Sequence, residues 1–278
     1  RENAKILSEN IEQSWRNLLS DKEKPALFLS GGLDTRTYLA HCPKKLKCIN
    51  LTYVKNRESE AAEKSCKITN QNFYWRELQQ GIYPKYLEKS SCVNSSMYIM
   101  DAIFYGHDEI LNDVDVIFSG YGIDWFFQGW YLPFKTFTFG KHKLYLRFLK
   151  NIKGDLVEFF INNFVGISKG FEPEKIVKEN YLKEINDDLI NTLNDLDGEI
   201  KNSTDNLYDR YENLAFGNIS RHYTYGAISA LKEYKEHRVL AFTNNIYDHY
   251  FNVPFKQRIE GRVEKEALKI KKPELLEI

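Results

Sequence analysis

Apolar residues along the first half of the chain follow the spacing of alternating helices and strands. Over residues 4–19 they recur every three or four positions, which predicts an amphipathic helix. The apolar run at 26–29 predicts a short buried strand, and the pattern after Gly31 and Gly32 predicts a helix over 35–41. Further strands are predicted at 48–54, 73–78 and 114–119, and further helices at 58–68, 83–87 and 97–111. This alternation predicts an α/β fold with a doubly wound, mostly parallel sheet.

The pattern changes beyond residue 140. Residues 144–164 and 176–196 contain no convincing run of strand-forming residues and are rich in Lys, Asp, Asn and Leu. The sequence FKTFTF at 134–139 predicts a turn or a β-ribbon. We therefore expect three parts: an α/β core over 1–140, a mainly helical subdomain over 141–250, and a returning segment over 251–278.

Composition narrows the class of protein. Of the 278 residues, 42% are hydrophobic and 28% are charged, which is typical of a globular domain. Lys and Arg together number 39, as do Asp and Glu, so the formal net charge is zero and neither a nucleic-acid partner nor an anionic membrane is indicated. The four cysteines lack C-x-x-C and zinc spacing, and the chain contains no apolar run of about 20 residues. We expect free thiols, a cytoplasmic location and no membrane segment.

Two glycine-rich turns carry the candidate chemistry. SGGLDT at 30–35 and SGYGID at 119–124 each follow a predicted strand. In a parallel sheet ligands bind at the carboxyl ends of strands, where glycines let backbone N–H groups approach an oxyanion. Asp34 would repel a phosphate unless a cation lay between them, so it predicts Mg²⁺, with Asp124 as the second carboxylate. Each turn alone is equally typical of an ordinary helix cap, but two acid-bearing turns at two strand ends favour a ligand site.

Three segments resemble those of a known family. SGGLDT closely resembles the pyrophosphate-loop motif S-G-G-x-D-[ST] of ATP pyrophosphatases, and together with SGYGID it resembles the synthetase domain of the asparagine synthetase and β-lactam synthetase superfamily. Residues 241–268 are similar in outline to the family segment that carries a lysine. The resemblance implies an adenine nucleotide alpha hydrolase-like fold, with ATP and Mg²⁺ as cofactors. It also implies cleavage of ATP between the α and β phosphates, formation of an acyl-adenylate, and displacement of AMP by an amine or ammonia.

The resemblance also implies roles for individual residues. Tyr121 occupies the position of the catalytic tyrosine of β-lactam synthetases, and Lys265 matches the lysine that stabilises developing negative charge. The acid that pairs with the tyrosine would be Glu158 or Asp155, and we expect Glu158. Asp34 and Asp124 would be the Mg²⁺ ligands. The residues expected at ATP or pyrophosphate are Leu29, Ser30, Gly31, Gly32, Asp34, Thr35, Leu51, Thr52 and Gly120.

Some residues near these motifs leave two interpretations open. Trp125 stands where asparagine synthetases have a glutamate, and Ala241 stands where the family has a proline. An aromatic cluster around the second turn would form either an apolar acceptor pocket or part of the core. Arg36 would reach a phosphate or a substrate carboxylate, or lie on the surface. Arg238, Arg258 and Arg262 are alternative anion binders, or surface residues.

We therefore expect an ATP-dependent amide-forming ligase, related to enzymes of asparagine biosynthesis, that acts on a small-molecule or peptide carboxylate and an amine donor. The 278 residues include no N-terminal glutaminase domain, so the amine would come from a separate or upstream glutaminase, from ammonia, or from a substrate. Alternatives are a peptide macrolactam cyclase or other specialised amidotransferase, a tRNA-modifying ATP pyrophosphatase, and a degenerate relative without catalysis.

Overall fold

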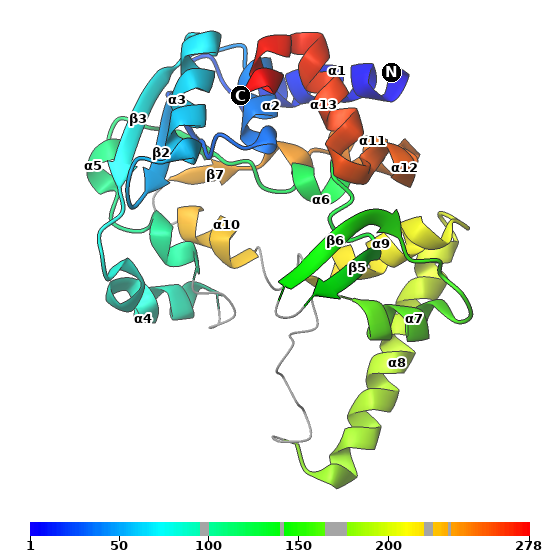
Figure 1. The fold of residues 1–278 in the computed structure, drawn as a ribbon. Coiled ribbons are helices and arrows are strands. Elements are labelled where there is room, and N and C mark those ends of the chain that lie inside the picture. The colour runs from blue at the N-terminus through cyan, green and yellow to red at the C-terminus, as the bar shows by residue number, and fades with distance from the viewer. Residues whose placement is uncertain (95–99, 140–141, 165–176, 220–224, 233–234) are drawn as a thin grey trace. The chain divides into compact units, whose positions relative to one another are not determined.

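A computed structural model describes residues 1–94, 100–139, 142–164, 177–219, 225–232 and 235–278 (Figure 1). It divides into two compact units. The first unit consists of Arg1–Trp130 and His222–Ile278, and the second of Tyr131–Arg221. The second unit therefore ends before 250, and residues 222–250, which we expected in the helical subdomain, belong to the first unit.

The first unit is built on a five-stranded parallel sheet with the order β3-β2-β1-β4-β7. In sequence order the strands are β1 (Pro25–Phe28), β2 (Lys47–Thr52), β3 (Asn72–Glu77), β4 (Val116–Phe118) and β7 (Glu236–Arg238). Every residue of β1 is buried, as expected for a central strand covered on both faces. The predicted α/β class with a parallel sheet is confirmed, and the architecture is Rossmann-like.

Helices connect and cover these strands. Those of the first unit before β4 are α1 (Glu2–Leu18), α2 (Leu33–His41), α3 (Arg57–Thr69), α4 (Ile82–Asn94), η1 (Met100–Phe104) and α5 (Asp108–Leu111). Those after β4 are α6 (Ile123–Phe127), α10 (Tyr225–Lys232), η4 (Leu240–Phe242), α11 (Asn244–Asn252), α12 (Phe255–Arg258), η5 (Ile259–Gly261), α13 (Arg262–Lys271) and η6 (Pro273–Glu277). The continuous helix expected over 97–111 is wrong, because the chain breaks at Gly106, which has a φ of +78°. Residues 97–99 lie outside the described part of the chain.

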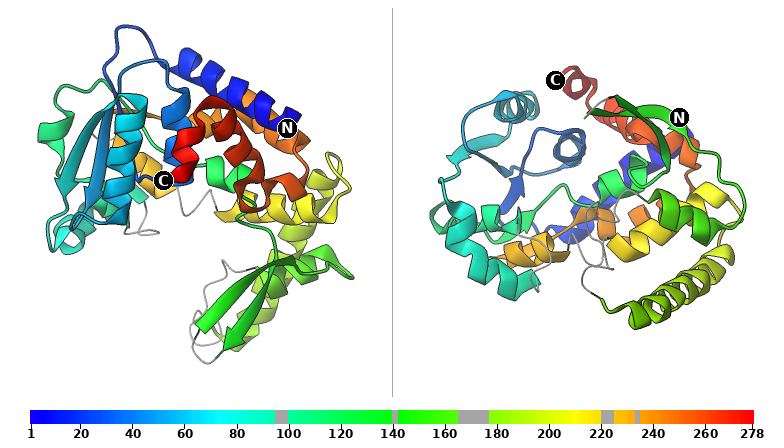
Figure 2. Two further views of the ribbon diagram at one scale, coloured as in Figure 1. Left: turned by 45° about the horizontal axis from the view of Figure 1, so that its top comes forward. Right: turned by 60° about the horizontal axis from the view of Figure 1, so that its bottom comes forward.

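Helices from opposite ends of the sequence lie side by side in the first unit. Figures 1 and 2 show α13 alongside α1, and the two helices are in contact. The ring of Trp15 on α1 lies 4.5 Å from the ring of Phe118 on β4. The indole nitrogen of Trp15 donates a hydrogen bond to the carbonyl of Tyr38 over 3.0 Å. Trp15 thus joins α1 to β4 and to α2, and α13 packs on α1 and α2.

The second unit contains an antiparallel pair of strands and several helices. Its elements are β5 (Phe134–Phe139), β6 (His142–Leu149), α7 (Leu156–Asn163), α8 (Glu179–Lys201) and α9 (Leu207–Ile219). Of the two alternatives predicted at 134–139, a turn or a β-ribbon, the structure shows the β-ribbon, as β5. The helical expectation for 142–149 is wrong, because Leu144, Leu146 and Phe148 recur at every second position, which is the period of a strand. In the described part of the chain, no helix combines the length and the apolar character needed to cross a bilayer.

Candidate functional site

The two glycine-rich turns follow neighbouring strands of the sheet. The turn at 30–35 follows β1 and leads into α2, and the turn at 119–124 follows β4 and leads into α6. After β1 the chain continues outward to β2 and β3, and it then crosses to β4 and β7 on the other side of β1. Strand order thus reverses between β1 and β4. In open parallel sheets such a switch point, at the carboxyl ends of the strands, is where ligands bind.

The turns touch each other. A Cβ atom placed on Gly120 would lie 2.7 Å from Cγ2 of Thr35 and 3.5 Å from Cβ of Asp34. The glycine is therefore required by the close approach of the second turn to the first. Ser30 Oγ accepts a hydrogen bond from the Gly32 amide over 3.2 Å and lies 3.3 Å from Thr35 Oγ1. The predicted phosphate cradle is brought together within the first unit.

Gly31 shapes the first turn. Its φ is +81°, and a Cβ atom there would lie 2.7 Å from both the Ala62 amide nitrogen and the Glu58 carbonyl oxygen of α3. Both the backbone conformation and the space thus demand glycine. The turn lies directly against α3 while its following residues begin α2.

The two predicted Mg²⁺ ligands lie in the first turns of their helices, Asp34 on α2 and Asp124 on α6. Burial, together with the charge of Asp124, raises the pKa of Asp34 from 3.8 to about 7. Burial raises the pKa of Asp124 to about 6. Two partly buried carboxylates that repel each other are stabilised by a proton or by a cation between them. The donor set therefore fits a magnesium ion that also binds phosphate oxygens.

Among the described residues, Asp34 and Asp124 are the two carboxylates that we assign to a cation. In the described residues, no group of three or more His, Cys, Asp or Glu side chains has the arrangement of a metal site. A cation here would therefore depend on oxygen atoms of a bound ligand to complete its coordination. Such dependence is the usual arrangement for Mg²⁺ held by one or two carboxylates.

Two further residues of the site were not predicted. The side-chain nitrogen of Gln128, which follows α6, donates hydrogen bonds to Oδ1 of Asp34 and, over 2.9 Å, to Oε2 of Glu264. Glu264 on α13 is completely buried, and its Oε1 lies 3.0 Å from Thr37 Oγ1. The available signal was the position of Glu264 among the buried apolar residues of α13, where an ionisable side chain is unexpected.

The three predicted catalytic residues lie on different elements of the fold. Tyr121 is half-buried and packs against the apolar cluster that contains Phe28 and Ile117. Lys265 is exposed on α13, a helix that contacts α2 and α6. Glu158 is exposed on α7 of the second unit, so its pairing with Tyr121 stays a prediction.

Asp155, the alternative partner of the tyrosine, has a structural role. Its Oδ1 accepts a hydrogen bond from the Glu158 amide over 2.8 Å and thereby caps the N-terminus of α7. This cap uses the side chain of Asp155 but only the backbone amide of Glu158.

Three of the residues expected at ATP, which the resemblance implies would lie beside its adenine, are at the carboxyl ends of β1 and β2. Leu29 is buried, and its amide donates to the Ile49 carbonyl over 2.8 Å. Leu51 is half-buried, and Thr52 is buried with its hydroxyl accepting from the Trp75 indole nitrogen over 2.7 Å. The Thr52 hydroxyl thus has a partner within the fold, and an adenine contact at these positions stays a prediction.

The aromatic cluster beside the second turn is mostly core. Trp125, Phe126 and Phe127 are buried, and the ring of Phe126 lies 5.1 Å from that of Tyr250 on α11. Trp130 is the exception, with 68% of its surface exposed. An apolar acceptor pocket is therefore not formed by the buried three.

The arginines near the motifs mostly have partners. Arg36 donates to the Leu275 carbonyl and, over 3.3 Å, to the Gly32 carbonyl, so it braces the first turn against η6. Arg258 is buried and lies 4.8 Å from the centre of the Tyr250 ring. Arg262 is exposed at the start of α13.

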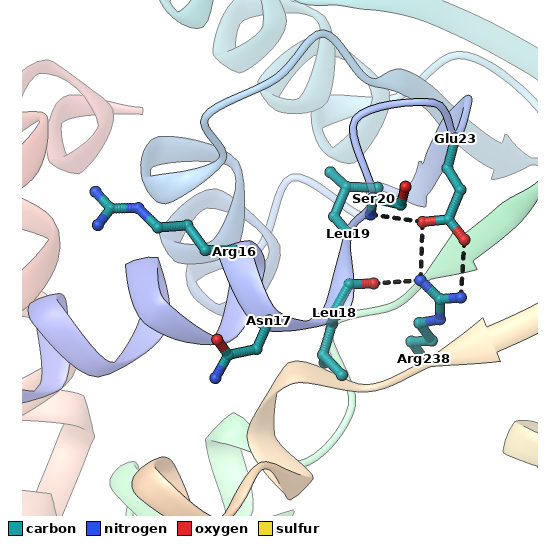
Figure 3. Close-up of a pocket in the computed structure, with 7 residues that line it drawn as sticks. All are labelled: Arg16, Asn17, Leu18, Leu19, Ser20, Glu23 and Arg238. Atoms are coloured by element: carbon teal, nitrogen blue, oxygen red, sulfur yellow. Dashed lines mark hydrogen bonds and ion pairs between the residues drawn. The ribbon is translucent and has the colours of Figure 1, made fainter.

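Arg238 borders a surface pocket of about 360 Å³ that shares no residue with the glycine turns (Figure 3). Its guanidinium donates to both carboxylate oxygens of Glu23, over 2.8 and 3.0 Å, and to the Leu18 carbonyl. The ion pair joins β7 to the segment between α1 and β1, and the hydrogen bond to Leu18 joins β7 to the end of α1. The guanidinium is thus already neutralised by a fixed acid.

No family model and no curated protein matches the chain. The function is therefore argued from the two turns, their acids and their position in the sheet.

Proposed function

We propose that this protein is an ATP-dependent amide-bond-forming ligase with an adenine nucleotide alpha hydrolase-like fold. A carboxylate substrate would be activated as an acyl-adenylate and then attacked by ammonia or an amine. The observation that carries the proposal is the contact between SGGLDT and SGYGID at the switch point between β1 and β4, which brings Asp34 and Asp124 to one site.

The first turn would hold the leaving end of ATP. In this proposal the backbone N–H groups at the start of α2 and the hydroxyls of Ser30 and Thr35, which lie 3.3 Å apart, would donate to the phosphate oxygens. Asp34 and Asp124 would hold Mg²⁺, which when bound supplies positive charge against the phosphates. Gly31 and Gly120 support this arrangement indirectly: they let the first turn pack against α3 and the second turn pack against the first.

The reaction would proceed by two substitutions. A carboxylate oxygen of the substrate attacks the α-phosphorus, and the bond from that phosphorus to the bridging oxygen breaks, releasing pyrophosphate. The amine nitrogen then attacks the acyl carbon, loses a proton, and the bond to AMP breaks. In this scheme Tyr121 would pass the proton of the amine to a carboxylate base, and Lys265 would stabilise the negative charge of both transition states.

The product of ATP cleavage tests the proposal. The protein is incubated with ATP, Mg²⁺, ammonium and a panel of amino acids and peptides, and pyrophosphate, AMP and new amides are measured. We expect pyrophosphate and AMP in equal amounts. ADP and phosphate as products would contradict the proposed cleavage. A peptide that loses one water and gains no amine would identify a macrolactam cyclase.

Asp34→Asn is the informative variant. Because it removes a carboxylate from the phosphate cradle, we expect turnover to fall at least about 100-fold. Asp248→Asn, at an exposed position on α11, is the matched control and should keep normal turnover. Full activity of Asp34→Asn would show that the metal assignment is wrong.

A further inference from the structure

A hydrogen-bonded chain leads from the buried end of α13 to Asp34. Glu264 Oε2 accepts from the Gln128 amide over 2.9 Å, and the same nitrogen donates to Oδ1 of Asp34. Glu264 is 0% exposed, although it lies on a helix whose next residue faces solvent. The three side chains come from α13, from the residue after α6, and from α2.

The orientation of the Gln128 amide follows from its neighbours. A carboxylate oxygen accepts hydrogen bonds, and the side-chain nitrogen of glutamine carries two hydrogens. With Asp34 on one side and Glu264 on the other, only the nitrogen of Gln128 can face both. Glu264 therefore fixes which way the amide points, and the amide in turn holds Oδ1 of Asp34.

The hydroxyl of Thr37 indicates the charge state of Glu264. Thr37 Oγ1 lies 2.9 Å from the Leu33 carbonyl oxygen and 3.0 Å from Glu264 Oε1, but a hydroxyl has only one hydrogen to donate. Both contacts are hydrogen bonds if Glu264 is protonated and donates to Thr37, which then donates to Leu33. Burial and the charge of Asp34 raise the pKa of Glu264 well above its ordinary value, in agreement with a neutral acid.

The backbone is shaped for this contact. Gly261, just before α13, has a φ of +67°, and a Cβ atom there would lie 3.0 Å from Leu33 Cδ2 and 3.3 Å from Gln128 Cγ. A larger residue would push the start of α13 away from α2 and from Gln128. The glycine therefore allows Glu264 to reach the amide.

We propose that Glu264 and Gln128 are positioning residues that fix the carboxylate of Asp34, so that Oδ2 faces the metal–nucleotide while Oδ1 is held by the amide. The inference rests on the proposed function only in that Asp34 binds a metal with the nucleotide. Glu264 touches neither the nucleotide nor the metal and acts through Gln128.

Manganese binding tests the proposal without measuring turnover. Free and bound Mn²⁺ are measured by electron paramagnetic resonance in the presence of ATP. Gln128→Met removes both donated hydrogen bonds, and Glu264→Leu removes the group that orients the amide. For each we expect the apparent Mn²⁺ affinity to fall about 10-fold or more, the effect of removing groups that orient a metal ligand.

Two conservative variants separate positioning from packing. Glu264→Gln supplies an amide that donates to Thr37 and accepts from Gln128, so we expect affinity within about twofold of the wild type. Glu266→Gln, at an exposed position on the same helix, should leave affinity unchanged. A role in packing alone would lower the melting temperature of Glu264→Leu without changing Mn²⁺ affinity.

The outcomes are distinguishable. Wild-type Mn²⁺ affinity in a folded Gln128→Met variant would overturn the inference, even if Glu264→Leu failed to fold. Absence of Mn²⁺ binding by the wild-type protein would overturn it as well. Mn²⁺ binding that depends on Gln128, without pyrophosphate release from ATP, would support the positioning role and reject the proposed ligase reaction.

Discussion

At the scale of single residues, the acids of the candidate site oppose folding. The carboxyl groups of Asp34 and Asp124 have raised pKa values, chiefly because they are partly buried. A group that is harder to ionise in the folded state than in the unfolded state makes folding less favourable at high pH. Such a cost is typical of a site organised for a ligand rather than for stability.

Asp34→Asn should therefore stabilise the protein at high pH. Well below pH 3.8 the wild-type carboxyl is protonated in both the folded and the unfolded state, so it does not lower the stability. As pH rises from 3.8 through about 7, the unfolded state ionises first and the wild type loses stability. Asparagine keeps an oxygen for Gln128 and carries no charge. The melting temperature of the variant should exceed that of the wild type at pH 8 and approach it near pH 4. A variant that melts below the wild type at pH 8 would contradict this.

Gly31→Ala should destabilise the first unit more than Gly81→Ala does. Both glycines have a positive φ, +81° and +76°, which costs alanine about 1–2 kcal/mol. At Gly81 nothing lies within 4 Å of the added carbon, whereas at Gly31 it would meet backbone atoms at 2.7 Å. Urea unfolding of the two variants measures the difference. Equal losses would show that α3 moves away without cost.

At the scale of elements, β7 is joined to the second turn by a buried side-chain contact. Ser119 Oγ lies 2.8 Å from Nε2 of His237, and Nδ1 of His237 lies 3.2 Å from the Ile228 carbonyl oxygen of α10. Because a carbonyl only accepts, Nδ1 carries the hydrogen and Nε2 accepts from the serine. Burial lowers the pKa of His237 to about 4, so the ring is neutral near pH 7. This histidine holds β7 and α10 to the turn that carries Asp124.

His237→Leu should lower the free energy of unfolding by about 1–3 kcal/mol, because it leaves the buried hydroxyl of Ser119 without its acceptor. The double variant Ser119→Ala/His237→Leu removes both polar groups and should recover part of that loss. Urea unfolding at pH 7 compares the wild type, His237→Leu, Ser119→Ala and the double variant. A double variant that loses the sum of both single effects would show that the two residues do not interact.

At the scale of the whole molecule, elements from distant parts of the chain complete one unit. The sheet receives its first strand from residues 25–28 and its last from residues 236–238, and α13 packs against α1. Leu268 of α13 is fully buried, whereas Ile270 on the same helix is 46% exposed. Substitutions at these two positions therefore distinguish the loss of packing from a general effect of changing a residue of α13.

Leu268→Ala should cost about 2–5 kcal/mol of unfolding free energy, the range for a large aliphatic residue removed from a core. Ile270→Ala should change it by no more than about 0.5 kcal/mol, as is usual for exposed positions. Chemical unfolding can be monitored by tryptophan fluorescence, because Trp15 is buried on α1, the helix that α13 contacts. Similar small effects at both positions would show that α13 is dispensable for the first unit.

Much of the first unit could be predicted because its information is local. Strands β1 to β4 each carry apolar residues of strand type, and the two glycine turns can be recognised from their Ser, Gly and Asp residues. β7 could not be predicted, since its residues Glu-His-Arg are polar and only pairing with β4 makes them a strand. Gln128 and Glu264 were missed for a related reason: their hydrogen bonds exist only once α13 packs against α2 and α6. The roles of such residues are set by tertiary contacts and cannot be recognised from the sequence pattern.

The place of α13 in the order of the chain has a consequence for biosynthesis. A ribosome releases this helix after every strand of the sheet has already emerged. Until then α1 lacks its contacts with α13, and Gln128 lacks Glu264, the acid that orients its amide. A nascent chain that has produced both glycine turns would thus still hold an unfinished site. The ability to bind the proposed ligand would therefore arise only after α13 has been synthesised and has packed against α2 and α6.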